Sequence, residues 1–179
     1  VNDDVVHRLF DMIGEHSGPG STVTLLGLSY KPGTHIIEES QSVMLAARLL
    51  DAGYKVRLHD PRALVSAGGA LGERATCCDD PYDAVSGAAV VVVLTNWPEY
   101  GELDMGRLED AVGPSPLLID CWRIYRDVGL NKFTYRAFGT MTLPSGSIGD
   151  DRRTDILYQD RRGRAPLLER APMQHPAFT

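Results

Sequence analysis

Short apolar runs that alternate with helical patterns constrain the fold of this chain most. The clearest run, Ala88 to Leu94, reads AAVVVVL, and its length and β-branched content are typical of a strand buried on both faces of a parallel sheet. Similar strand patterns occupy residues 22–28, 55–59, 117–119 and 133–138. Helical spacing of apolar residues recurs at 3–13, 40–50 and 103–112, with a short helical segment at 81–86. This alternation predicts an α/β, Rossmann-like three-layer domain with a mostly parallel sheet.

Three parts are expected along the chain. Residues 1–20 form a leading helix and linker, 21–140 an α/β domain, and 141–179 a loosely ordered polar tail rich in arginine, glycine and proline. The leading helix carries an apolar face that includes Val5, Leu9 and Ile13. That face either packs back on the domain or self-associates. The first residue is Val1, which suggests a piece of something longer or an alternative start codon.

Composition excludes several function classes. The net charge of −6 and pI of about 5.3 give no reason to expect a nucleic-acid partner. The longest apolar run is far shorter than a membrane span, and no signal-peptide pattern is visible. The cysteines, Cys77, Cys78 and Cys121, lack metal-ligand spacing, so we expect no metal site and reduced thiols in a cytoplasmic protein.

Familiar catalytic and cofactor motifs are absent from the sequence. The first strand pattern runs into Gly27 and then Gly33, six residues on, which fits neither G-x-G-x-x-G nor a phosphate loop. No G-x-S-x-G, H-E-x-x-H or C-x-x-C occurs. We therefore expect an α/β domain without a catalytic set of its own. Ligands bind beyond the carboxyl ends of parallel strands, where residues 28–38, 95–100 and 120–125 leave the sheet.

Several linked motifs resemble one enzyme family. Residues 25–61 read LLGLSYKPGTHIIEESQSVMLAARLLDAGYKVRLHDP, residues 91–100 read VVVLTNWPEY, and residues 117–125 read LLIDCWRIY. In that order they are similar to the carboxyl-terminal domain of the UDP-glucose/GDP-mannose dehydrogenase family. Its patterns are roughly L-G-L-[AS]-[FY]-K, V-x-x-[YH]-D-P, T-[DE]-W-x-[EQ]-F and V-x-D-x-R. The resemblance covers about residues 1–140 and implies a nucleotide-sugar (UDP) binding domain.

The resemblance implies a division of labour. Family enzymes are NAD-dependent and oxidise the 6-hydroxyl of a nucleotide sugar, such as UDP-glucose, to a carboxylate. Their NAD domain and their catalytic thiol lie in a part that would precede Val1. None of the three cysteines here falls at the motif of that thiol. We therefore expect no catalytic residue and no bound cofactor in this chain alone, with NAD and an NAD-binding dehydrogenase portion implied for the complete enzyme.

Three substrate-binding residues follow from the motifs. The aromatic-lysine pair of the family falls on Tyr30 and Lys31, where an ammonium group can neutralise a diphosphate and a ring can pack beside sugar or base. Arg123 is the third, because it lies one place after the position of the family's arginine. On an extended segment that shift reverses the side chain, so Arg123 substitutes only if the loop slips by one residue. Ser40 is expected to cap the next helix.

Departures from the family pattern leave a second interpretation open. Trp122 stands where the substrate-binding arginine belongs, and we expect it to cover the core rather than stack on a base. Glu38 stands where an arginine reaches towards NAD, and a carboxylate there would repel a pyrophosphate. The alternative is therefore a degenerate, non-catalytic module that serves binding, regulation or assembly.

Overall fold

A single six-stranded sheet organises the described part of the chain. The computed structural model describes residues 3–29, 33, 37 and 40–138. The strands lie in the order β3-β2-β1-β4-β5-β6, and every neighbouring pair is parallel. They are β1 (Thr22–Leu26), β2 (Lys55–His59), β3 (Thr76–Cys77), β4 (Val90–Val93), β5 (Leu117–Asp120) and β6 (Thr134–Ala137). The predicted Rossmann-like α/β class is confirmed.

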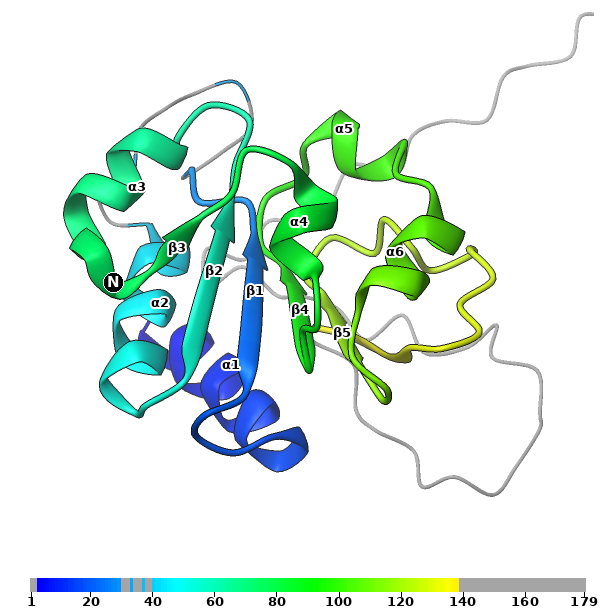
Figure 1. Cartoon of the computed structure of the whole chain (residues 1–179), viewed down its shortest axis with the longest axis horizontal. Helices are drawn as coiled ribbons and strands as arrows, with labels where there is room; N and C mark the ends of the chain where they lie inside the picture. Colours follow the sequence, from blue (N-terminus) through cyan, green and yellow to red (C-terminus); the bar gives the residue numbers. More distant parts are fainter. Residues whose placement is uncertain (1–2, 30–32, 34–36, 38–39, 139–179) are drawn as a thin grey trace, which may run out of the picture. The chain divides into compact units, whose positions relative to one another are not determined.

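Helices cover both faces of this sheet. One face carries α1 (Asp3–His16), α2 (Gln41–Asp51) and α3 (Leu64–Leu71), and α3 is followed by the 3₁₀ turn η1 (Gly72–Arg74). The other carries α4 (Pro81–Val85), α5 (Pro98–Gly101) and α6 (Met105–Ala111). In Figure 1, α4 lies in front of the strands and α1 behind them. The sequence patterns missed the short elements β3 and α5, and they were ambiguous where α3 lies.

The side chains of β4 show why this sheet needs two covers. Val90 and Val92 belong to the cluster beneath α1 and α2, whereas Val91 and Val93 belong to the cluster beneath α4 and α6. All four are fully buried. Successive side chains of a strand point to opposite faces, so an all-valine strand is stable only between two apolar layers.

The leading helix packs on the domain, which decides between its two predicted roles. Leu9 and Ile13 of α1 are fully buried, and both join the core cluster with residues of α2 and β1. Burying a side chain of this size contributes roughly 1.5–3 kcal/mol. The helix is therefore part of the folded unit.

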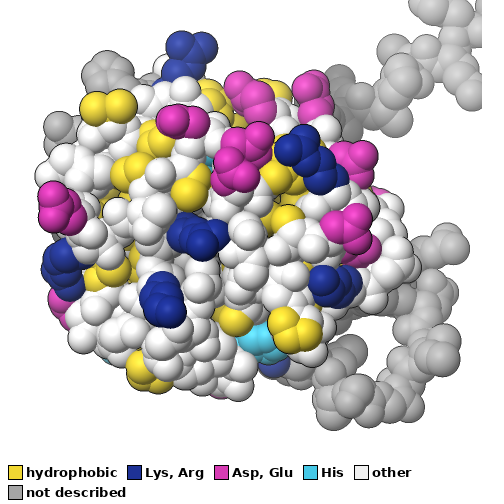
Figure 2. Space-filling view, in the orientation of Figure 1, with side chains coloured by type: hydrophobic (Ala, Val, Ile, Leu, Met, Phe, Trp, Pro, Cys, Tyr) yellow, Lys and Arg dark blue, Asp and Glu magenta, His cyan; other side chains and the backbone are white. Residues whose placement is uncertain are grey.

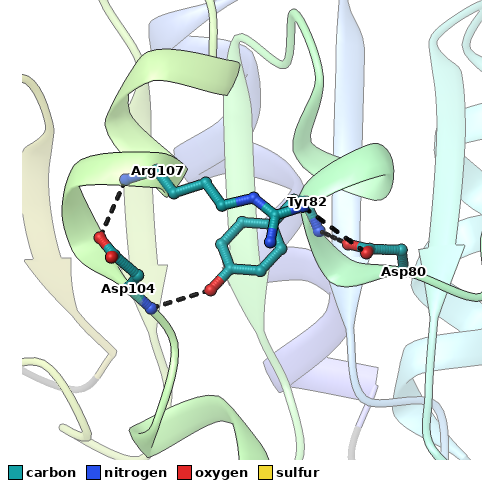
Figure 3. A network of polar contacts seen from close by, with 4 residues as sticks. All are labelled: Asp80, Tyr82, Asp104 and Arg107. Carbon is teal, nitrogen blue, oxygen red and sulfur yellow. Dashed lines mark hydrogen bonds and ion pairs between the residues drawn. The ribbon is translucent and has the colours of Figure 1, made fainter.

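A polar network joins the first turns of α4 and α6 (Figure 3). Asp80 caps α4 by accepting a hydrogen bond from the Tyr82 backbone N–H at 2.7 Å, and Asp104 caps α6 by accepting one from the Arg107 N–H at 3.0 Å. The Tyr82 hydroxyl accepts from the Asp104 N–H at 2.9 Å. The Arg107 guanidinium lies 3.8 Å from the centre of the Tyr82 ring. Side-chain caps of this kind stabilise a helix by about 1 kcal/mol each.

Residues 1–139 form one compact unit. The predicted polar tail, 141–179, lies outside the described residues and stays a prediction. On the face shown in Figure 2, acidic side chains gather where α5 and α6 lie, with basic side chains between them. No helix among the described residues is long and apolar enough to cross a membrane.

Candidate functional site

The order of the strands places the topological switch point of the sheet between β1 and β4. From β1 the chain proceeds outward through β2 and β3, and it then returns to β4 on the other side of β1. The loops that leave β1 and β4 therefore diverge at their carboxyl ends, which is where doubly wound sheets bind ligands. Two of the three predicted segments, 28–38 and 95–100, start at this point.

A buried carboxylate, Asp60, holds the end of β1 in place. Its Oδ2 accepts hydrogen bonds from the backbone N–H groups of Leu28 at 2.7 Å and Ser29 at 3.1 Å. The same oxygen accepts from the Ser29 hydroxyl at 3.2 Å and from the Trp97 indole N–H at 3.1 Å. Asp60 directly follows β2, so this one side chain connects the ends of β1, β2 and β4.

The same side chain stays ionised. Oδ1 of Asp60 accepts from the backbone N–H groups of Arg62 at 2.8 Å and Ala63 at 2.7 Å. Burial alone would raise the pKa of Asp60, but its backbone N–H donors outweigh burial and lower it. Only 4% of Asp60 is exposed. Asp60 was not among the predicted site residues, although the D in the family's V-x-x-[YH]-D-P pattern was the available signal.

A close backbone approach joins β1 to the loop after β4. Gly27 has a φ of 95°, and a methyl group built there would lie 2.5 Å from Thr95 Cβ and 2.6 Å from Thr95 N. Only glycine allows both this conformation and this contact. The Thr95 hydroxyl then donates to the Ser29 carbonyl at 3.0 Å. Thr95 was not among the predicted site residues, although the T in the family's T-[DE]-W pattern was the available signal.

The loop that carries the predicted lysine is held at both ends. Ser29, its last described residue before the gap, is held by Asp60 and Thr95. At the far end Ser40 occupies the N-cap position of α2, but its side chain makes no capping bond. The predicted cap is therefore wrong: the hydroxyl donates to the Leu28 carbonyl at 2.6 Å and closes the loop instead. Tyr30, Lys31, Thr34, His35, Ile36 and Glu38 lie outside the described residues.

The segment after β5 is a turn, not the extended segment expected from the sequence. Asp120, which is fully buried, accepts from the Trp122 N–H at 3.0 Å through Oδ1. Its Oδ2 accepts from the Tyr125 N–H at 2.9 Å and from the Tyr135 hydroxyl at 3.2 Å. These bonds hold Arg123 in a left-handed conformation with φ 57°. Side chains therefore do not alternate here as they would on an extended segment, and the exposed side chain of Arg123 leaves from a turn after β5.

The structure contradicts the prediction that Trp122 covers the core. The residue is 52% exposed and belongs to neither core cluster. Its indole N–H donates to the Leu94 carbonyl at 2.9 Å, directly after β4. The Asp120 turn places Trp122 next to the carboxyl end of β4, and no periodicity in the sequence could show this.

The three thiols are poor nucleophiles at neutral pH. Burial and the neighbouring Asp120 raise the pKa of Cys121 to about 12. Burial and Asp79 raise the pKa of Cys77, and burial is also the main cause that raises the pKa of Cys78. A thiol reacts as its thiolate, so these surroundings oppose nucleophilic catalysis.

His59 and Tyr100 form a buried pair next to Asp60. The Tyr100 hydroxyl donates to the His59 carbonyl at 3.1 Å and lies 3.0 Å from His59 Nδ1. Burial lowers the pKa of His59 despite the nearby Asp60. The imidazole is therefore neutral at physiological pH, and the pair supports the end of β2 from within.

Comparison with known proteins identifies the family. Residues 24–127 match the UDP binding domain of the UDP-glucose/GDP-mannose dehydrogenase family. The chain belongs to this family. The match extends from β1 through the Asp120 turn, so it includes Asp60, Thr95, Asp120 and Trp122. The predicted resemblance is confirmed.

Relatives with printed names agree with the family assignment. The UDP-glucose 6-dehydrogenase of Rhizobium meliloti is 35% identical over 122 residues, covering 67% of this chain and 28% of that protein. The enzyme of the same name from Pseudomonas aeruginosa is 33% identical over 141 residues, covering 73% and 31%. The chain thus spans less than a third of the length of either relative.

Solved structures show the same fold. A UDP-glucose dehydrogenase from Pyrobaculum islandicum superposes with a TM-score of 0.59 at 30% identity, covering 66% of this chain and 26% of that one. A ternary complex of the GDP-mannose dehydrogenase from Pseudomonas aeruginosa gives 0.59 at 22% identity, covering 75% and 31%. The chain therefore has the same Rossmann-like layered fold as these two dehydrogenases.

Proposed function

We propose that this chain binds the nucleotide end of a nucleotide sugar, such as UDP-glucose, for an NAD-dependent 6-dehydrogenase. The observation that supports the proposal is that hydrogen bonds join the loops at three neighbouring strand ends. Asp60 and Thr95 both hold Ser29, and Leu94 holds Trp122, so the loops after β1, β4 and β5 meet there. The residues that make these contacts all lie within the part of the chain that matches the family's UDP binding domain.

Cations at this edge supply the affinity in this proposal. Lys31 follows two residues after the anchored Ser29, and its ammonium group would neutralise a diphosphate. Tyr30 would pack beside the sugar or the base. Arg123 adds a second positive charge from the Asp120 turn, and a guanidinium is suited to bidentate phosphate contact.

NAD does not fit the end of β1. A dinucleotide-binding loop offers free backbone N–H groups to the pyrophosphate at a helix N-terminus directly after the first strand. Here the N–H groups of Leu28 and Ser29 already donate to Asp60, so they are not free to bind a pyrophosphate. The next helix, α2, begins only at Gln41. We therefore assign NAD, and the thiol that the family uses, to another portion of the dehydrogenase.

Titration of the 179-residue chain with UDP and UDP-glucose at low salt tests this function. We expect dissociation constants between the micromolar and low millimolar ranges, weaker binding for Arg123→Ala, and loss of binding for Lys31→Ala. Lys55→Ala is the matched control. It removes the same charge from an exposed position at the start of β2, at the end of the sheet opposite to the carboxyl ends of the strands. No heat and no chemical-shift change at several millimolar UDP would refute the proposal.

One observation favours a second candidate, a non-catalytic binding, regulatory or assembly module. Trp122 stands at the family's arginine position and exposes its ring. The coding sequence upstream of Val1 separates the two candidates. A G-x-G-x-x-G unit and a cysteine-bearing region in the same frame would support the dehydrogenase, whereas their absence would support the module. The cytoplasmic location stays a prediction in either case.

A further inference from the structure

The indole of Trp122 is both exposed and fixed, which is an unusual combination. Large exposed hydrophobic residues are few in the described part of the chain: Val65, Trp122 and Val128. Of these, Trp122 has the largest side chain, and leaving half of it in water sacrifices hydrophobic stabilisation that a buried indole would provide. Two hydrogen bonds hold it there, from its backbone N–H to Asp120 and from its indole N–H to the Leu94 carbonyl.

The position of Trp122 relates directly to the loop that carries Lys31. Leu94, which holds the indole, is followed by Thr95, whose hydroxyl binds the Ser29 carbonyl. Because β4 lies between β1 and β5, the Lys31 loop leaves the sheet on one side of β4 and Trp122 on the other. A ligand that reaches across the end of β4 can therefore lie between the end of β1 and the indole of Trp122.

We propose that Trp122 is the base-stacking residue of the nucleotide site. This inference rests on the proposed function and adds a contact that the family's arginine at this position cannot make in the same way. A fixed aromatic face stacks on the π-face of a nucleobase and loses little conformational entropy on binding, because the ring is already held. The charge of the neighbouring Arg123 favours the attached phosphate.

Stacking on a nucleobase sets a measurable scale. Removal of an aromatic partner by substitution weakens base binding by about 5- to 150-fold. The loss must depend on the base, so binding of inorganic pyrophosphate, which has no ring, stays unchanged. UDP and UDP-glucose lose affinity to the same degree, because the base is common to both. A larger loss for UDP-glucose would instead place the sugar on the indole and overturn the proposal.

The experiment compares Trp122→Leu with Trp122→Phe and with a control, Val128→Ala. Val128 lies in the same β5–β6 segment and is 39% exposed, so its truncation reports on general effects of removing exposed apolar surface there. Calorimetric titration with UDP and with pyrophosphate is expected to show weakened UDP binding for Trp122→Leu alone. Trp122→Phe is expected to retain most of the affinity, because it keeps an aromatic face.

Fluorescence supplies a second, independent readout. The chain contains two tryptophans, and Trp97 is buried beside Asp60. UDP is therefore expected to quench the emission of Trp122, and the quenching is expected to disappear in Trp122→Phe although that variant still binds. Quenching that persists in Trp122→Phe overturns the proposal, even if Trp122→Leu fails to fold.

The results also distinguish this inference from the function on which it rests. If the unaltered chain binds UDP and loses it in Lys31→Ala, but Trp122→Leu binds UDP as before, only the stacking role is refuted. An equal loss of affinity for UDP and for pyrophosphate in Trp122→Leu also refutes the stacking role, because the effect of the indole would then not depend on the base. If the unaltered chain binds neither ligand, both proposals are wrong.

Discussion

Replacement of Asp60 by asparagine tests the central feature of the candidate site. Asp60→Asn preserves shape but converts one acceptor oxygen into an NH₂ donor. Oδ2 serves the Leu28, Ser29 and Trp97 N–H groups as well as the Ser29 hydroxyl, whereas Oδ1 serves the Arg62 and Ala63 N–H groups. In either orientation of the amide, its NH₂ group points at backbone N–H groups, which then have no acceptor.

The less harmful orientation sets the expected magnitude. With the NH₂ group at the Oδ1 position, two N–H donors lose their acceptor, those of Arg62 and Ala63. Each unsatisfied donor costs about 1–3 kcal/mol, so the substitution is expected to lower the free energy of unfolding by about 2–6 kcal/mol. That is a large part of the total for a domain, about 5–15 kcal/mol.

The effect of Asp60→Asn depends on pH in a defined direction. The folded state lowers the pKa of Asp60 below its unfolded value of about 3.9. The contribution of the carboxylate is therefore complete above that value and is lost as the pH falls through the lower, folded pKa. The difference in stability between the unaltered chain and the Asp60→Asn variant is thus constant near neutral pH and decreases below about pH 4.

Urea denaturation followed by far-UV circular dichroism measures this difference. Asp110→Asn is the control, because it makes the same chemical change at an exposed position and is expected to shift stability by less than about 0.5 kcal/mol. Equal, small effects of Asp60→Asn and Asp110→Asn at pH 7 would refute the argument that this carboxylate organises the strand ends. So would a difference that grows as the pH falls.

Three further changes probe the surroundings of the site, each measured by urea denaturation. Gly27→Ala is expected to lower stability by at least about 2 kcal/mol, because its φ is 95° and the new methyl group would lie 2.5 Å from Thr95 Cβ. Gly20→Ala, with φ 88° and no neighbour within 4 Å, is expected to lose only about 1 kcal/mol, and equal effects would contradict the close approach. Leu9→Ala is expected to lower stability by about 2–5 kcal/mol, whereas Val65→Ala, at an 89% exposed position, is expected to change it little. Thr95→Val removes the bond to the Ser29 carbonyl and is expected to lower stability by about 1 kcal/mol and to weaken UDP binding, and unaltered UDP affinity would separate Thr95 from the site.

Local patterns were sufficient for the architecture and insufficient for the site. The all-valine β4 is readable from sequence because only a strand buried on both faces tolerates such a run. By contrast, β3 has two residues and α5 has four, so neither carries enough residues to establish a period. The cap predicted at Ser40 failed because a contact twelve residues away, the Leu28 carbonyl, competes for the hydroxyl.

The α/β class, the family and the strand ends at which a ligand would bind can be read from the sequence, because they depend on periodicity and on motifs along the chain. Three features of the site become visible only in the folded chain: Asp60 binds the N–H groups after β1, Gly27 lies against Thr95, and Trp122 faces solvent. Each of these features joins residues at least 28 positions apart or arises from a turn that a distant hydrogen bond holds. Hydrogen bonds and close contacts between strands depend on which strand ends become neighbours in the sheet, and local spacing carries no record of that.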